Sequence, residues 1–128
     1  MHISKIYKEM KDIALSEFSD LAMAAEILRL STGDPLKLRL DIVDGSFLDV
    51  YISVTGQYSD HWERRMIPAG DIYRYDNAPH EKWRSLKSFP RHFHDGAESH
   101  VVESELADKS EQAITQVLGL VRKRLTSI

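Results

Sequence analysis

Four of the six histidines in this 128-residue chain lie between residues 61 and 94, together with several arginines and acids. Imidazole has an unperturbed pKa of ~6.5, so grouped histidines are suited to proton transfer or to metal binding at neutral pH. The candidate catalytic residues are His80, His92, His94 and Asp76. In an extended strand His92 and His94 point to one side, about 6.5 Å apart, so both can face one phosphate or one metal ion.

One chemistry that such residues can perform is cleavage of RNA through its own 2′-hydroxyl. That reaction needs a base, an acid and cations around the phosphate, and positioned acid–base groups contribute ~10²–10⁴-fold. We expect His80 and His92 to be the acid–base pair. His94 is expected either to substitute for one of them or to donate a hydrogen bond to the phosphate. Asp76 is expected to orient His80. The expected substrate-binding residues are Arg74, Arg84, Arg91, Tyr75 and Asn77.

These substrate-binding assignments have different physical reasons. The guanidinium group suits bidentate phosphate contacts, and an aromatic ring can stack on an unpaired base. Tyr75 also fits a packing role in a strand, and the run from Asp76 to Pro79 also fits a turn held by its own side-chain hydrogen bonds.

The same histidines leave two other interpretations open. His80, His92 and His94, with Asp95 or Asp76, offer three imidazoles and a carboxylate, which is a ligand set for one divalent transition metal. The metal-independent interpretation needs no cofactor. A third interpretation is not enzymatic: the basic segment binds a partner or a nucleic acid and acts by occlusion.

Charge is distributed unevenly along the chain. The formal net charge is −3, but residues 61–94 hold seven Lys/Arg against four Asp/Glu, which leaves +3 in that window and −6 in the remainder. A short window reaches such a value by chance as well. The chemical interpretation is a local anion site on an acidic body.

The elements that must position these residues follow from hydrophobic periodicity. Residues 6–14 and 114–125 carry the apolar stripe of amphipathic helices, and Asp108 with Glu111 resembles a capping box for the second. Alternating residues predict strands at 36–42, 48–54, 58–65 and 72–76, and a fifth near 25–31 on weaker grounds. Asp44-Gly45 predicts a tight hairpin turn. Residues 77–103 read as loop or irregular strand.

The predicted fold is therefore α+β. An antiparallel sheet of four or five strands is covered on one face by the N-terminal and C-terminal helices, in one domain spanning residues 1–128. The chain has no cysteine and no run of ~18 apolar residues, so we expect a cytoplasmic protein without membrane contact. Phosphate-loop, nucleotide-binding, serine-hydrolase and zincin motifs do not occur in the sequence.

Three segments together resemble the TumE-type toxins of toxin–antitoxin modules. They are the Tyr-x-x-His-Trp run at 58–62, residues 72–80, and the Phe-Pro-Arg-His-x-His-Asp-Gly run at 89–96. The resemblance spans about residues 36–105. It implies a small toxin encoded beside a helix-turn-helix antitoxin. The resemblance leaves the mechanism open, so RNA is the expected substrate on the histidine and arginine chemistry alone. Homodimerisation is left open.

Overall fold

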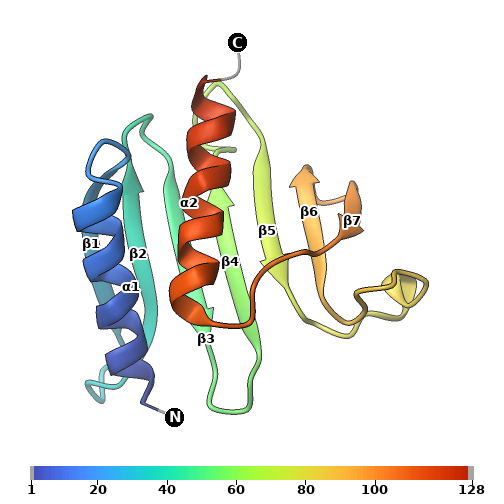
Figure 1. Ribbon diagram of the computed structural model, residues 1–128, viewed down its shortest axis with the longest axis horizontal. Helices are drawn as coiled ribbons and strands as arrows, with labels where there is room; N and C mark the ends of the chain where they lie inside the picture. The colour runs from blue at the N-terminus through green and yellow to red at the C-terminus, as the bar shows by residue number, and fades with distance from the viewer. Residues whose placement is uncertain (1, 127–128) are drawn as a thin grey trace.

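The computed structural model describes residues 2–126 as two helices on one face of a seven-stranded sheet (Figure 1). The helices are α1 (Ile3–Glu17) and α2 (Ser110–Thr126). The strands are β1 (Ala22–Arg29), β2 (Pro35–Ile42), β3 (Phe47–Ile52), β4 (Tyr58–Glu63), β5 (Ile72–Asp76), β6 (His92–Gly96) and β7 (Val101–Glu103). All neighbours are antiparallel and follow chain order.

The alternation of β2 to β5 places apolar side chains under the helices. Leu40 and Leu48 are register partners across the β2–β3 hairpin, and both are fully buried. Gly45 in that hairpin has φ +92°, a conformation that glycine adopts without steric cost. Tyr7 and Met10 of α1 and Ile114 and Leu118 of α2 complete the core above the sheet.

The α+β class and the two covering helices are confirmed, but the expected number of strands was wrong. The weakly predicted first strand exists as β1, paired with β2. The two further strands, β6 and β7, lie in the segment expected to be loop or irregular. Imidazoles at two buried positions on the helix-free face of β6 hide its alternation, and β7 has only three residues, too few for a periodic signal.

Helix α2 begins at Ser110, so Asp108 does not immediately precede it as a capping box would require. Asp108 instead pairs with Arg91, whose Nη1 lies 3.4 Å from Asp108 Oδ1. Within residues 2–126, no helix is both long and apolar enough to cross a membrane.

The two faces of β5 and β6 have different chemistry. Tyr75 and Phe93 lie on the helix side, where their rings stack with centroids 4.2 Å apart. Because side chains alternate along a strand, Arg74 and Asp76 on β5 and the two histidines of β6 project from the helix-free face. The candidate catalytic groups are thus separated from the main core by the thickness of the sheet.

Candidate functional site

The centre of the site consists of two pairs of facing residues on β5 and β6. The register places Arg74 opposite His94 and Asp76 opposite His92. Asp76 Oδ1 lies 3.0 Å from His92 Nε2, and Asp76 Oδ2 lies 3.7 Å from His94 Nε2. One carboxylate therefore lies between two imidazoles.

Both imidazoles are held in the same tautomer by backbone carbonyls. His92 Nδ1 lies 2.9 Å from the carbonyl oxygen of Pro90, and His94 Nδ1 lies 2.9 Å from that of Glu98. A carbonyl oxygen only accepts, so each Nδ1 carries the proton and donates it. With a proton on each Nδ1, the Nε2 atom of each ring is the one that lies near the Asp76 carboxylate.

Within residues 2–126, His92 Nε2 is the one side-chain nitrogen or oxygen that is closed off from solvent and has no aligned hydrogen-bond partner. Its side chain is 1% exposed, and the 3.0 Å approach of Asp76 lacks the direction of a hydrogen bond. Buried polar atoms are rarely left unpaired. This nitrogen therefore marks a place where a proton or a cation can be held.

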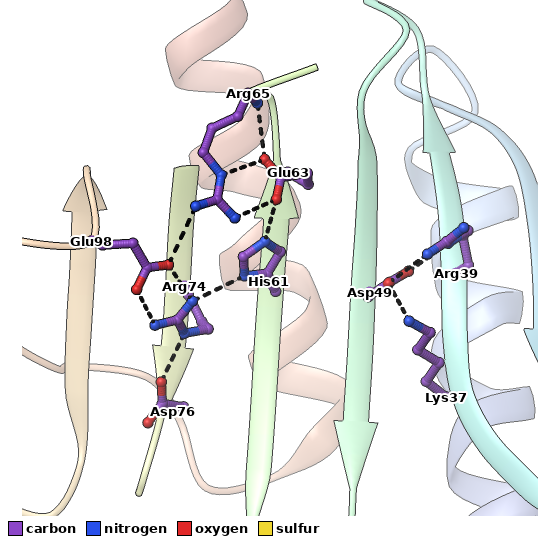
Figure 2. A network of polar contacts seen from close by, with 9 residues as sticks. All are labelled: Lys37, Arg39, Asp49, His61, Glu63, Arg65, Arg74, Asp76 and Glu98. Carbon is purple, nitrogen blue, oxygen red and sulfur yellow. Dashed lines mark hydrogen bonds and ion pairs between the residues drawn. The ribbon is translucent and has the colours of Figure 1, made fainter. Parts of the chain in front are cut away.

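Arg74 ties the carboxylates of the site together (Figure 2). Its Nη1 and Nη2 donate to the two oxygens of Glu98 at 2.6 and 2.8 Å, and its Nε donates to Asp76 Oδ2 at 2.9 Å. These bonds raise the pKa of Arg74 and lower the pKa of Glu98 to about 2. Glu98, between β6 and β7, thereby fixes the guanidinium.

Arg74 also contacts two imidazoles. Its Nη2 lies 3.1 Å from His94 Nε2, and its Nη1 lies 3.3 Å from His61 Nδ1 on β4. Burial lowers the pKa of His94, and the charge of Arg74 acts in the same direction. His94 is therefore neutral at pH 7, with Nε2 as a basic atom beside a fixed cation.

Trp83 covers this group from the loop that joins β5 to β6. It ends the short 3₁₀ helix η1 (Glu81–Trp83), and its ring centroid lies 6.1 Å from those of both His92 and His94. Beside the ring is an open pocket of about 360 Å³. Its lining consists of Arg74, Asp76, His80, Lys82, Trp83, His94, Glu98 and Ser99.

Three atoms of the site also have the arrangement of metal ligands. One ligand atom from each of Asp76, His92 and His94 can be chosen so that all lie within 4.8 Å of one another. Ligands ~2.1 Å from one zinc ion in its usual tetrahedral arrangement are ~3.4 Å apart. The Asp76–His92 and Asp76–His94 approaches of 3.0 and 3.7 Å lie on either side of this value. The backbone bonds at both Nδ1 atoms are typical outer-shell support. Against this, Arg74 already donates to two of the three residues.

The pocket gathers only part of the predicted site. His80, His94, Asp76 and Arg74 line it together. His92 lies beneath Trp83 and does not line the pocket, so it is badly placed for direct proton transfer to a substrate. Asp76 bonds with Arg74 and the Ala78 amide, and no described contact joins it to His80.

The remaining predicted residues lie elsewhere. Arg84 is exposed and pairs with Glu81 on the loop surface. Asn77 fixes the backbone of the β3–β4 hairpin through Tyr58 N and Gly56 O. Three more lie on the helix side of the sheet: Arg91, Tyr75 and Asp95. Asp95 pairs with Arg124 there, so it does not join the histidines as a ligand.

Sequence reasoning missed the roles of Lys82 and Glu98 in this pocket. Lys82 Nζ lies 4.7 Å from the centroid of the Trp83 ring, beside the histidines that this ring covers. The position of Lys82 next to Trp83, in a positively charged segment, was the sequence signal that could have indicated this role. Nothing local in the sequence indicates that Glu98 folds back onto Arg74, 24 residues earlier.

Comparison with known families gives one match. A family model described as Toxin TumE matches residues 11–125, nearly the whole chain. No curated protein and no solved structure matches.

Proposed function

The chain belongs to the TumE toxin family, and we propose that it is the toxin of a toxin–antitoxin module and that it inhibits growth by cleaving RNA in the pocket beside Trp83. The family implies an antitoxin as partner. A helix-turn-helix antitoxin and an RNA substrate are the finer parts of the proposal.

The observation that carries the proposal is the contact between His94 Nε2 and Arg74 Nη2, 3.1 Å apart at the wall of the pocket. A neutral imidazole beside a guanidinium provides a base and an anion-binding group at one point. His80 adds a second imidazole and Lys82 an ammonium to the same pocket. An anionic substrate with a proton to lose, such as an RNA phosphodiester, matches this set.

The proposed reaction starts when the 2′-hydroxyl replaces Arg74 as the partner of His94 Nε2. His94 takes the proton, the 2′-oxygen attacks phosphorus, and the bond from phosphorus to the 5′-oxygen breaks. His80 gives a proton to the leaving 5′-oxygen. The products are a 2′,3′-cyclic phosphate and a 5′-hydroxyl, and Arg74 and Lys82 stabilise the charge on the phosphate oxygens.

Asp76 and His92 support this centre without touching the substrate. Asp76 accepts from Arg74 Nε and from the amide of Ala78, which fixes the start of the covering loop. His92 fills the space between Asp76 and Trp83. We therefore assign the acid–base pair as His80 and His94, in place of His80 and His92.

A metal-dependent hydrolase is the second candidate, favoured by the unpaired Nε2 of His92. One divalent transition metal held by Asp76, His92 and His94 would activate water for attack on a phosphate ester. Arg74 would have to leave His94 and Asp76 for the ion to enter. Loss of the Arg74–His94 contact on addition of Zn²⁺, followed by NMR, would favour this candidate.

Growth and antitoxin binding together test the proposal. His94→Ala and His80→Ala should relieve growth inhibition while the purified variants still bind the antitoxin. His100→Ala is the matched control, because His100 is exposed and, among residues 2–126, its imidazole bonds only to the Asp95 carbonyl. If loss of toxicity always accompanies loss of antitoxin or nucleic-acid binding, occlusion is the correct account.

A further inference from the structure

A second pocket lies on the helix side of the sheet, away from the histidines. It has a volume of about 330 Å³ and lies among α1, the start of α2 and the β3–β4 hairpin. Figure 1 shows the N-terminal ends of both helices at this edge of the sheet. Apolar side chains of Ile6, Met10, Ile52, Leu106 and Ala113 form part of its lining.

The carboxylate of Asp60 also lines this pocket, and nothing in the fold explains its presence. Register pairs place Asp60 between Val50 on β3 and Tyr75 on β5, in a row that continues to Phe93 and Val102. The other members of this row are apolar or aromatic. Asp60 is 4% exposed.

Asp60 has no partner in the described part of the chain. No hydrogen bond or ion pair joins its carboxylate to any residue from 2 to 126, although buried carboxylates are normally paired. Burial raises the pKa of Asp60 to about 7, so the charged form is strongly disfavoured without a partner. An ionisable group buried at this cost is more typical of binding sites than of packing.

The other ionisable groups that line this pocket already have partners. Arg91 donates to the Leu106 carbonyl, lies 3.4 Å from Tyr58 Oη and pairs with Asp108 at its outer end. Asp60 is therefore the ionisable group left for a ligand, and its charge selects a cation.

We propose that this pocket binds a primary ammonium group carried on a short apolar chain, with the ammonium at Asp60 and the chain against Ile6, Met10 and Ile52. A free alkylamine and a lysine side chain of a partner protein share this chemistry. The proposal concerns the face opposite the histidines, so it stands or fails independently of RNA cleavage.

The test uses n-pentylammonium, which resembles a lysine side chain, and n-pentanol as its uncharged match. Binding to the full chain is followed by amide NMR shifts. We expect shifts at β4 and at the start of α2 with n-pentylammonium, at least tenfold weaker binding of n-pentanol, and tenfold or greater loss with Asp60→Asn. Asp41→Asn, an exposed acid on β2, should bind as the wild type does.

The pH dependence gives a second readout that does not need a variant. Three tyrosines interact electrostatically with Asp60, namely Tyr7 of α1, Tyr58 of β4 and Tyr75 of β5. Their pKa values are raised above 10, so they stay neutral between pH 6 and 8, while Arg91 stays charged. Asp60 loses its proton in that range, so n-pentylammonium should bind more tightly at pH 8 than at pH 6.

A capped Leu-Lys-Leu peptide distinguishes the two sources of the ammonium group, a free alkylamine and a lysine side chain of a partner protein. Tighter binding of the peptide than of n-pentylammonium identifies a protein side chain as the ligand, and binding of the amine alone identifies a small molecule. Equal binding of n-pentanol and n-pentylammonium, unchanged binding in Asp60→Asn, or no shift with any probe would overturn the proposal.

Discussion

Asp76 and His92 face each other across β5 and β6, with Oδ1 and Nε2 3.0 Å apart and no hydrogen bond aligned between them. His92 thus fills space beneath Trp83 and limits the position of the carboxylate that holds Arg74. His92→Ala should lower the free energy of unfolding by roughly 2–4 kcal/mol, because it empties a fully buried position. Urea unfolding measures this, and a stability equal to wild type would contradict the packing role.

His94→Ala should reduce kcat for RNA cleavage by ~10²–10⁴-fold, since it removes the proposed base. Because the pKa of His94 is lowered, the base form is present throughout the neutral range. In the wild type, the limb of kcat/KM that rises with pH and reports this base should therefore lie below ~6.5. His100→Ala should follow the wild-type profile, and an unchanged rate in His94→Ala would exclude this base.

Trp83→Ala should raise the pKa of His94 toward its ordinary value, because desolvation is the largest cause of its lowering and Trp83 covers the ring. The acid limb of the activity profile should move to higher pH in parallel. Imidazole NMR titration of the variant measures the shift directly. Trp83→Phe keeps an aromatic cover and should stay close to wild type, whereas an unmoved pKa in Trp83→Ala would show that Trp83 does not exclude water.

Lys82→Ala should weaken RNA binding and reduce the slope of log K against log salt concentration by about 0.7, the value for one contact to a single-strand phosphate. Arg84 is the matched control, because it lies two residues away on the same loop but outside the pocket. Arg84→Ala should leave the slope unchanged. Equal effects of the two substitutions would indicate diffuse attraction rather than a defined site.

Asp60→Asn should stabilise the protein increasingly as pH rises. The folded-state pKa of Asp60, about 7, exceeds the ordinary value of 3.8 for this carboxyl. The carboxyl therefore favours the folded state fully only below pH ~4, and that benefit is lost by pH 7. The variant should equal wild type near pH 4 and exceed it at pH 8 by up to about 4 kcal/mol. Thermal unfolding at the two pH values measures this, and a pH-independent difference would contradict the burial of an unpaired acid.

The sequence allowed β2 to β5 and both helices to be predicted, because each has one apolar face and the strands are joined by turns with clear signals. The pairing of β6 with β5 could not be predicted. The alternation of β6 is hidden by His92 and His94, which are polar by type but buried under Trp83.

Part of the site could have been assigned better by strand parity alone. Arg91 and Asp95 are an odd number of positions from His92 and His94, so an extended strand places them on the other face, as the structure does. Tyr75 lies between Arg74 and Asp76 and follows the same rule. The fold-back of Glu98 and the burial of Asp60 in an apolar row required the tertiary structure.

The most direct measurement is to incubate the purified toxin with labelled total RNA and a tRNA pool, with EDTA and with added divalent metal, and to map the new ends. The account predicts cleavage that survives EDTA and leaves 2′,3′-cyclic phosphate and 5′-hydroxyl ends, with His94→Ala inactive in parallel. Cleavage only with added metal would instead support a metal-dependent hydrolase with Asp76, His92 and His94 as the metal ligands. Absence of cleavage under both conditions would contradict RNA cleavage as the activity of this site.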